Sequence, residues 1–379
     1  MKTKIFSIFH GRFPSEKAAS LFAAKGSEAF AKIGTEVTLI VPRRIWREKI
    51  NSYKYYNLEK NFKIIYLPTL DFFAAPLIRK IAFPTSFLIF SFFSFIYLLF
   101  KAGRQDIIYS NESLPILFAS FYFSNTSYEL HDFPEGNKFF YKLLFRRIRH
   151  LLITNKWKAE KVVREFNVLE KKIILERNAV DVKEFDIPIG KIEARKKLGL
   201  PIEKQIAVYT GHLYSWKGTD TLAEAVRALP SMLMIFVGGT DPDIERFKTL
   251  FGSIENIMLV GHKEHAEVPY WQSVADVLIL PNTAKEDISK FYTSPMKMFE
   301  YMASRRPIVA TDIPSIREVL NDNNAIIVVP DNAESLAEGI TKAFSDSKLR
   351  ETITARAYAD AESHTWEKRA KRIFDFIKK

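Results

Sequence analysis

Cysteine is absent from this chain of 379 residues, so the protein forms no disulfide bonds and offers no thiolate ligands to a metal. A three-glycine dinucleotide-binding fingerprint is also missing, which argues against a nicotinamide or flavin cofactor. The one Asp-x-Asp motif, at 241–243, has no further carboxylate or histidine at a metal-binding spacing, and we interpret it as a turn into a helix. We therefore expect neither a metal nor another cofactor. The absence of cysteine and of a recognisable signal peptide favours a cytoplasmic setting.

Positive charge is concentrated in the first half of the chain. The formal net charge is +12, and residues 1–180 hold 29 Lys and Arg against 15 Asp and Glu, whereas the remainder holds 27 against 29. This asymmetry predicts that the first half faces an anionic partner, either phospholipid head groups or nucleic acid. Because the cations are not interleaved with aromatic residues in any known nucleic-acid-reading module, we expect an anionic membrane surface and no nucleic acid.

Short apolar runs alternate with helical patterns along the whole chain, which predicts an α/β protein with parallel sheets. The runs are rich in β-branched residues, and several end in a turn with glycine or proline, as a strand in a βα unit does. The length and the hydrophobic content of 47% suffice for two such domains. Ligands are then expected at the carboxyl ends of the strands. The predicted strands are 4–9, 36–41, 62–67, 107–110, 205–210, 232–237, 257–260 and 276–280.

The segment 81–100 contains twenty residues and no charge, and it is flanked by cations on both sides. Its length just suffices to span a bilayer. The strands predicted before and after it belong to one sheet, however, so both ends of the segment must stay on the same side. We keep three placements open: a membrane span, a helix buried in the domain, and a helix lying partly in the membrane interface, which its many phenylalanines favour.

A helix start is predicted at Ser294 and Pro295, because serine is a good N-cap and proline fits the first helical position. The free backbone amides at Met296 and Lys297, together with the lysine charge, then form a site for a phosphate or diphosphate. Glu300 follows on the same face of the helix and can accept hydrogen bonds from sugar hydroxyls. The alternative is a capped surface helix with an i,i+3 ion pair.

The stretch 291–303 resembles the donor-binding signature of the retaining glycosyltransferases of family 4. That resemblance runs nearly end to end, and it implies the GT-B fold, in which two Rossmann-like domains face each other across a cleft. The family usually carries two glutamates eight residues apart in this stretch. The second falls on Glu300, and Tyr292 occupies the position of the first.

A second part of the resemblance is the loop 211–220, where the family usually has Gly-Arg and then Lys-Gly around the donor diphosphate. Lys217 matches the lysine, and His212 replaces the arginine, so we expect weaker or pH-sensitive phosphate binding. The turn after 257–260 corresponds to the family's nucleobase side. The resemblance therefore implies a donor site made of Gly211, His212, Lys217, Gly239, His262, Lys263, Ser294, Pro295, Met296, Lys297 and Glu300.

On the acceptor side, the family's first loop corresponds to Gly11 and to Ser15, Glu16 and Lys17, where Ser15 is also a candidate helix cap. The alternative is an ordinary helix N-terminus without a binding role. His131 matches the histidine that reaches the transferred sugar, and we expect Asp132 to orient it. A structural histidine in a turn is the alternative.

The segment 176–181 resembles the turn that closes the family's first domain, which places the domains at 1–182 and 183–364, with a helix at 365–379 returning to the first. The implied catalytic residues are His131, Lys217, Lys297 and Glu300, and the lysines stabilise the departing diphosphate in place of a metal. We expect an enzyme that moves a sugar from a nucleotide-sugar to a lipid-linked or cell-surface glycan acceptor. It would lie peripherally at the inner face of the membrane. The alternative is a catalytically silent nucleotide-sugar or glycan-binding subunit of the same fold.

Overall fold

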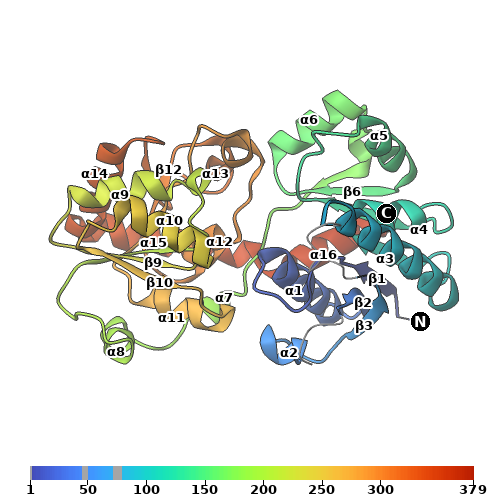
Figure 1. Cartoon of the computed structure of the whole chain (residues 1–379), viewed down its shortest axis with the longest axis horizontal. Helices are drawn as coiled ribbons and strands as arrows, with labels where there is room; N and C mark the ends of the chain where they lie inside the picture. The colour runs from blue at the N-terminus through green and yellow to red at the C-terminus, as the bar shows by residue number, and fades with distance from the viewer. Residues whose placement is uncertain (1, 45–49, 71–78) are drawn as a thin grey trace. The chain divides into compact units, whose positions relative to one another are not determined.

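The computed structural model describes residues 2–44, 50–70 and 79–379, and it places all of their side chains except those of 79–81. The chain forms two compact units (Figure 1). The first contains Met1–Arg177 and Trp366–Lys379, and the second contains Asn178–Thr365. The sequence placed the boundaries at 182 and 364. Each unit is an α/β domain with one parallel sheet.

The first unit has a seven-stranded sheet in the order β3-β2-β1-β4-β5-β6-β7. Because the order reverses beside β1, the loops after β1 and β4 diverge at this point, where such sheets bind ligands. The strands are β1 (Lys4–Ile8), β2 (Glu36–Arg43), β3 (Lys63–Pro68), β4 (Ile107–Ser110), β5 (Thr126–Leu130), β6 (His150–Ile153) and β7 (Ile173–Leu175). The helices are α1 (Ala18–Lys32), α2 (Ser52–Tyr55), α3 (Arg79–Lys101), α4 (Ser113–Ala119), α5 (Lys138–Arg147), α6 (Lys156–Phe166) and α16 (Trp366–Ile377).

The second unit has a six-stranded sheet in the order β10-β9-β8-β11-β12-β13, and here the order reverses between β8 and β11. The strands are β8 (Ile206–Thr210), β9 (Leu233–Val237), β10 (Ile257–Gly261), β11 (Val277–Leu280), β12 (Ile308–Thr311) and β13 (Ile326–Val328). The α-helices are α7 (Val182–Phe185), α8 (Lys191–Lys197), α9 (Thr219–Arg227), α10 (Asp241–Phe251), α11 (Val268–Ser273), α12 (Met296–Ala303), α13 (Pro314–Arg317), α14 (Ala333–Ser345) and α15 (Ser347–Ala361). Short turns of 3-10 helix include η3 (Ser215–Lys217) and η4 (His265–Glu267), and η5 (Ile288–Tyr292) is a π-helical turn.

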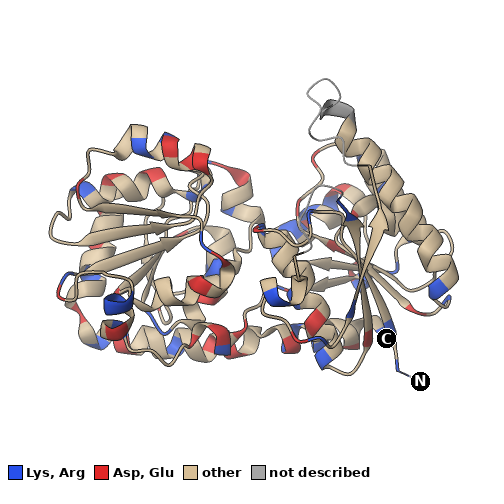
Figure 2. Ribbon diagram, turned by 60° about the horizontal axis from the view of Figure 1, so that its bottom comes forward, with Lys and Arg blue, Asp and Glu red and all other residues tan. Residues whose placement is uncertain are grey.

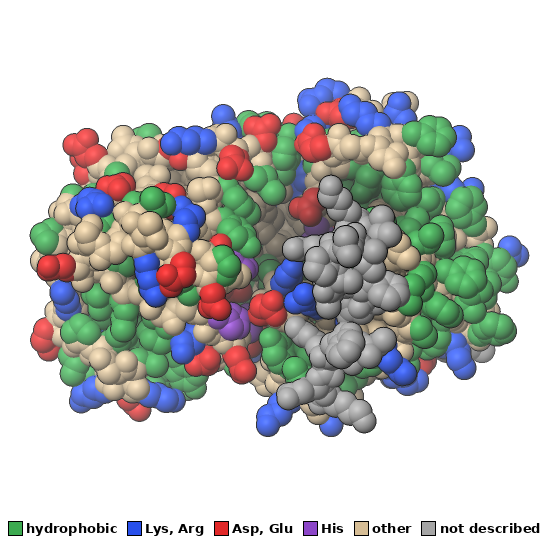
Figure 3. Space-filling view, in the orientation of Figure 1, with side chains coloured by type: hydrophobic (Ala, Val, Ile, Leu, Met, Phe, Trp, Pro, Cys, Tyr) green, Lys and Arg blue, Asp and Glu red, His purple; other side chains and the backbone are tan. Residues whose placement is uncertain are grey.

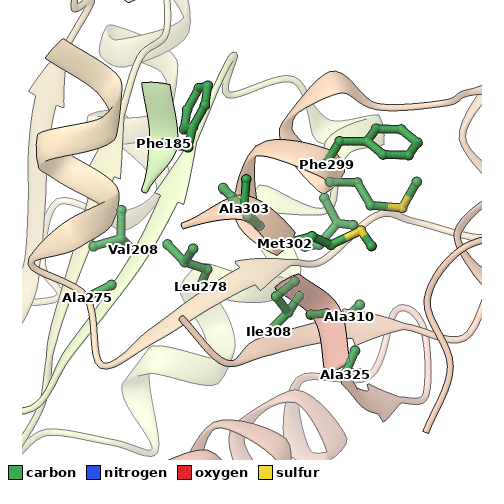
Figure 4. Packing of buried hydrophobic residues seen from close by; sticks show 14 of the residues in the cluster. Phe185, Val208, Ala275, Leu278, Phe299, Met302, Ala303, Ile308, Ala310 and Ala325 are labelled. Atoms are coloured by element: carbon green, nitrogen blue, oxygen red, sulfur yellow. The ribbon is translucent and has the colours of Figure 1, made fainter. Parts of the chain in front are cut away.

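Successive residues of each strand in the second unit pack into two different cores. Val208 and Leu278 belong to the core that holds α12, whereas Tyr209 and Ile279 belong to the core under α9 and α14. Both faces of the sheet are therefore covered by helices, which explains why its strands read as continuous apolar runs. Figure 4 shows the first of these cores, where α12 packs on the sheet through Met302 and its neighbours.

Helix α3 covers the predicted apolar segment, and it is neither fully buried nor separate from the domain. Its inner face packs into the core of the first unit through Phe90 and Leu98, which are fully buried. Its outer face exposes several large side chains, among which Phe100 is 80% exposed. By length and composition the helix could cross a membrane, but only 28% of its apolar window is buried. The fully buried placement is therefore wrong.

Two predicted helix caps are wrong. Helix α12 begins at Met296, with Pro295 in the cap position, and the Ser294 side chain caps nothing. The Ser294 carbonyl instead accepts a hydrogen bond from the Asn178 side chain, which fixes this residue outside the helix. Helix α1 begins three residues after Ser15, because the Ser15 backbone N–H donates to the Tyr56 hydroxyl at 2.6 Å and holds the chain away from the helix.

Candidate functional site

The carboxyl edge of the second sheet brings the loop after β8 against the start of α12. The Tyr301 hydroxyl of α12 accepts a hydrogen bond from the Thr210 N–H at 2.8 Å, which ties the helix to the end of β8. Gly211 then turns with φ +122°, and a β-carbon there would lie 2.9 Å from the Lys297 Nζ. A residue without a side chain is therefore required where the chain passes Lys297.

Lys217 and Lys297 both lie at this edge, close enough for the charge of Lys217 to act on the pKa of Lys297. Lys297 lies 3.8 Å from the centre of the Tyr209 ring, and Lys217 lies 3.8 Å from that of Trp216. Burial lowers the pKa of Lys217 to about 8. Burial and the charge of Lys217 also hold the pKa of Lys297 well below its usual range, although Glu300 opposes this. Among the described residues, neither ammonium group forms an ion pair with a carboxylate.

Gly218 explains how the Lys217 loop is held. It adopts φ +76°, and a β-carbon at this position would lie 1.7 Å from the Pro281 carbonyl oxygen after β11. Only glycine fits this conformation and this approach. The contact joins the loops after β8 and β11, the two strands between which the strand order reverses.

His212 lies beside the lysines but is not the cation that an arginine would be there. Its ring stacks on Tyr214 at 4.9 Å, and its Nδ1 lies 3.6 Å from the Asp243 carboxylate. Burial lowers the pKa of His212, Asp243 opposes this, and the two lysine charges lower it further. The imidazole is therefore mostly neutral at pH 7. Asp243 itself belongs to the capping box of α10, as the turn interpretation of 241–243 predicts.

The remaining donor-side candidates lie at the ends of β9 and β10. Gly239 has φ +93° and packs against Leu213 of the Lys217 loop. His262 is exposed, and the Lys263 Nζ lies 3.9 Å from Glu267. His262 and Lys263 thus lie on the same sheet edge as the lysine pair.

Glu300 faces a histidine that the sequence analysis missed. Its Oε1 lies 3.6 Å from Nε2 of His265 in η4, and no Lys297–Glu300 ion pair occurs among the described residues. The i,i+3 pair that was the alternative interpretation of α12 is therefore wrong. His265 lies only four residues from β10 in the chain, but no local motif marks it.

In the first unit, His131 follows β5 and is oriented by Glu129, not by Asp132. Its Nε2 lies 3.2 Å from the fully buried Glu129 carboxylate, and its ring contacts the Phe22 edge at 4.6 Å. Asp132 is exposed. The expectation for Asp132 is wrong because consecutive residues at a strand end point to opposite faces, whereas 129 and 131 share one.

Glu129 is held as an anion by a salt bridge to Arg369 of α16 at 2.5 Å and by the Tyr109 hydroxyl. Burial raises the pKa of Glu129, but Arg369 and His131 outweigh it, and the pKa is lowered overall. Such a buried ion pair is costly to break from one side. A charged residue within the buried strand β5 is the sequence signal for this network.

The acceptor-side candidates surround the loop after β1. Gly11 packs on Phe9, and Glu16 and Lys17 are exposed. Ser15 is buried, and its hydroxyl is hydrogen-bonded to that of Ser20 at 2.7 Å, so it is not available to a ligand.

Glu112 is a second carboxylate that the sequence analysis missed. It follows β4 and accepts a hydrogen bond from the His10 N–H at 3.0 Å. Burial raises its pKa, while the backbone N–H of His10 and the charge of His131 lower it. Glu112 and His131 therefore lie together at the carboxyl edge of the first sheet.

Comparison with known proteins matches the second unit to a family. Residues 190–360 match the family model described as Glycosyl transferases group 1. The match lies within the second unit, which holds the lysine pair. Over 153 residues the chain is 31% identical to the putative teichuronic acid biosynthesis glycosyltransferase TuaC of Bacillus subtilis. The matched region covers 40% of this chain and 36% of TuaC. The chain spans between 36% and 59% of the length of the first curated relatives that it matches.

Solved structures share the fold along the whole chain. Sucrose-phosphate synthase from Thermosynechococcus elongatus has a TM-score of 0.78 at 19% identity and covers 100% of this chain, with 98% of its own length matched. Anabaena HepE, solved in complex with UDP and glucose, has a TM-score of 0.74 at 17% identity, with 99% of both chains covered. The predictions of the family and of the GT-B fold are thus confirmed.

Proposed function

We propose that the protein is a retaining glycosyltransferase that moves a sugar from a nucleoside-diphosphate sugar to a hydroxyl of a lipid-linked or cell-surface glycan acceptor. The observation that carries this proposal is the pair of desolvated, unpaired lysines, Lys217 and Lys297, beside the start of α12. A diphosphate supplies the negative charge that this site lacks. The names of TuaC and of the HepE complex agree with a surface-glycan product and a UDP-linked donor.

The proposed reaction breaks the bond between the sugar's anomeric carbon and the diphosphate oxygen. A bond from the acceptor oxygen to the same carbon forms on the same face, and the proton of the acceptor hydroxyl passes to the departing diphosphate oxygen. Lys217 and Lys297 stabilise the negative charge that develops on the diphosphate, which is the role a metal ion has in other transferases. His131 contacts the transferred sugar, and Glu129 holds its ring in place.

The test is a thermal-shift panel of UDP-, GDP-, ADP- and dTDP-sugars, followed by measurement of nucleoside diphosphate release with an acceptor glycan. Lys297→Met should abolish the shift, since it removes a charge at the diphosphate without changing the helix. Lys348→Met, which changes an exposed lysine on α15, is the matched control and should show the same thermal shift with the nucleotide sugar as the wild type. If no nucleotide sugar stabilises the protein, the proposal is wrong.

The second candidate is a silent nucleotide-sugar-binding subunit. It is favoured by His212, which is mostly neutral where the family has arginine, and by Tyr292 at the position of the first glutamate. Nucleotide-sugar binding without release of free diphosphate, in the presence of extracts that contain lipid-linked glycans, would support this candidate over the enzyme.

We further propose that the first unit docks on the anionic inner face of a membrane through the outer face of α3. Hydrophobic side chains gather on this region in Figure 3, and most of α3 is drawn tan in Figure 2, since no charged residue lies between Lys80 and Lys101. This apolar helix face consists of Leu88, Phe92, Phe93, Leu99 and Phe100, all of them exposed.

Cations at the edge of the same surface favour a lipid occupant. Arginine guanidinium groups lie over the exposed aromatic rings that follow α4. The Arg147 guanidinium is 3.9 Å from the centre of the Phe121 ring, and that of Arg104 is 4.8 Å from the centre of the Tyr122 ring. Apolar rings beside cations suit the boundary between acyl chains and anionic head groups. The inner face of α3 also touches the acceptor side, because Ser86 lies 3.2 Å from the ring of His10.

Vesicle flotation tests this docking. The protein should bind phosphatidylcholine vesicles that contain phosphatidylglycerol more strongly than vesicles without it, and Phe100→Ser should weaken the binding by about tenfold, because burying a phenylalanine is worth roughly 1.5–3 kcal/mol. Leu250→Ser, which changes an exposed leucine in the second unit, is the control. Equal binding of both variants and the wild type would refute the docking surface.

A further inference from the structure

Three charged side chains from distant segments converge beside the lysine pair in the second unit. His265 of η4 lies between Glu184 of α7 and Glu300 of α12. Its Nδ1 is 3.5 Å from the Glu184 Oε1, and its Nε2 is 3.6 Å from the Glu300 Oε1. The side chains are 21%, 10% and 11% exposed, respectively, so solvent screens them only weakly.

The imidazole in this cluster is a cation at neutral pH. Burial lowers the pKa of His265, but the nearby carboxylates of Glu184 and Glu300, at 3.5 and 3.6 Å, outweigh burial and raise it to about 9. Of the other charges near the histidine, Glu264 and Glu267 cap the amides of η4 itself, with Glu267 accepting from the Glu264 N–H at 3.2 Å. The cluster as a whole is therefore negative by one charge.

Helix α12 divides its polar side chains between two partners. Lys297 lies over the Tyr209 ring at the anion site, whereas Glu300, one turn later, has one carboxylate oxygen directed to His265. The charge of Glu300 still reaches Lys297, since it acts on the pKa of that lysine. Glu300 thus lies within electrostatic range of the diphosphate site while a second oxygen stays available to accept hydrogen bonds.

We propose that His265 is a positioning residue for the nucleotide: it bridges Glu184 and Glu300 and orients the Glu300 carboxylate toward the ribose hydroxyls of a bound nucleoside diphosphate. This inference rests on the proposed function. A carboxylate that is fixed before binding loses little conformational freedom when it accepts the hydroxyls, so the bridge increases affinity through the ribose and not through the phosphates.

The experiment compares ribose-dependent affinity with and without the histidine. Wild type and His265→Gln are titrated calorimetrically with UDP, GDP and ADP, and with the 2′,3′-dideoxy analogue of whichever binds most tightly. Hydrogen bonds to charged groups are worth about 1.5–3 kcal/mol, so His265→Gln should weaken ribonucleotide binding roughly tenfold or more and leave dideoxynucleotide binding nearly unchanged. A structural role alone would weaken both ligands equally.

A second measurement needs no variant at this position. In the wild type, the affinity ratio between the ribonucleotide and its dideoxy analogue should fall between pH 7.5 and pH 10, as the imidazolium loses its proton. The ratio cancels the titration of Lys217 and Lys297, because both ligands carry the same diphosphate. Glu184→Gln should give a smaller loss of the same kind.

The outcomes separate the two proposals. If the wild type binds none of the three nucleoside diphosphates, the proposed function fails. The role of His265 is refuted, while the donor site stands, if the wild type binds one of them and either of two results follows. One is that the affinity ratio between the ribonucleotide and its dideoxy analogue is the same in His265→Gln as in the wild type. The other is that this ratio does not change with pH in the wild type.

Discussion

Removing the Lys217 charge should make the protein more stable and a worse binder of nucleoside diphosphates. The change is Lys217→Met, which keeps an unbranched side chain against Trp216 and removes the ammonium group. A lysine that served the fold would have the opposite effect, because its removal would leave a partner unpaired. The sign of the stability change therefore distinguishes a binding lysine from a structural one.

The magnitude follows from the lowered pKa. The unfolded lysine binds its proton up to a pKa near 10.4, whereas the folded one releases it near pH 8, so the unfolded state holds more protons between these values. Stability consequently rises with pH across this window, and below pH 8 the charge destabilises the fold. At about 1.4 kcal/mol per pKa unit, the lowering from 10.5 to about 8 corresponds to roughly 3 kcal/mol.

Two effects reduce the gain that the variant can show. The side chain is partly exposed, which weakens the desolvation, and its contact with the Trp216 ring at 3.8 Å is worth about 0.5–1 kcal/mol when charged. We therefore expect Lys217→Met to raise the free energy of unfolding by about 1–2 kcal/mol at pH 7. The gain should disappear at pH 10, where the wild-type lysine is neutral as well.

Hydrogen exchange of the β8 amides measures this locally, which matters because a protein of two units need not unfold in one step. Calorimetric titration with the nucleoside diphosphate that the wild type binds should show a loss of about tenfold or more for the variant. Lys348→Met should change neither quantity. A destabilised Lys217→Met at pH 7, with a deficit that persists at pH 10, would refute the assignment of Lys217 to an anion site.

Three further predictions concern the networks around the two sheet edges. Arg369→Met should destabilise the first unit by about 3–5 kcal/mol at pH 7, because it leaves Glu129 buried without its main partner; adding Glu129→Gln should restore much of this, as urea unfolding with exchange of β5 can measure. His131→Asn should lower kcat by roughly a hundredfold or more without changing the affinity for the free nucleoside diphosphate, since that ligand lacks the transferred sugar that His131 is proposed to contact. Gly218→Ala should destabilise the second unit by about 1–3 kcal/mol and weaken UDP binding, because its β-carbon meets Pro281.

The architecture was predictable because its signals are local and long. The apolar run at 205–210 corresponds to β8 at Ile206–Thr210, and the uncharged segment at 81–100 corresponds to α3 at Arg79–Lys101. A strand covered on both faces must be apolar throughout, so its burial can be recognised in the sequence as a continuous apolar run. The sequence cannot tell how much of a long apolar helix a domain will cover, and α3 is accordingly half-exposed.

Helix starts were harder, because a capping residue competes with tertiary hydrogen bonds. Ser294 and Ser15 both have the chemistry of an N-cap, but Asn178 binds the carbonyl of one, and Tyr56 and Ser20 bind the polar groups of the other. Asn178 and Tyr56, two of these competing partners, lie far from Ser294 and Ser15 in the chain. A rule that considers only the neighbouring residues has no access to them.

The residues of the candidate site likewise fall into those that could be predicted from the sequence and those that could not. Lys217 and Lys297 could be selected from the sequence because each belongs to a contiguous loop-helix motif whose backbone defines the position of the charge. Glu112, Glu129 and His265 could not, because each receives its role from a strand or turn that the topology brings alongside. Of these, only Glu129 left a trace, as a charged residue within a buried strand.

The spacing of Lys297 and Glu300 is also that of an ordinary i,i+3 ion pair, and the absence of this pair among the described residues affects ligand binding. Such a pair would neutralise both groups and leave nothing at the sheet edge to attract an anion. Tyr209 draws Lys297 to one side, and His265 draws Glu300 to the other. The helix therefore presents separate positive and negative positions about one turn apart, roughly 5 Å along the axis. A nucleoside diphosphate has the complementary arrangement, with an anionic diphosphate next to hydrogen-donating ribose hydroxyls, whereas inorganic phosphate matches only the first position. Pyrophosphate binding should accordingly weaken far more in Lys297→Met than in Glu300→Gln, and an equal loss in both variants would contradict this division of roles.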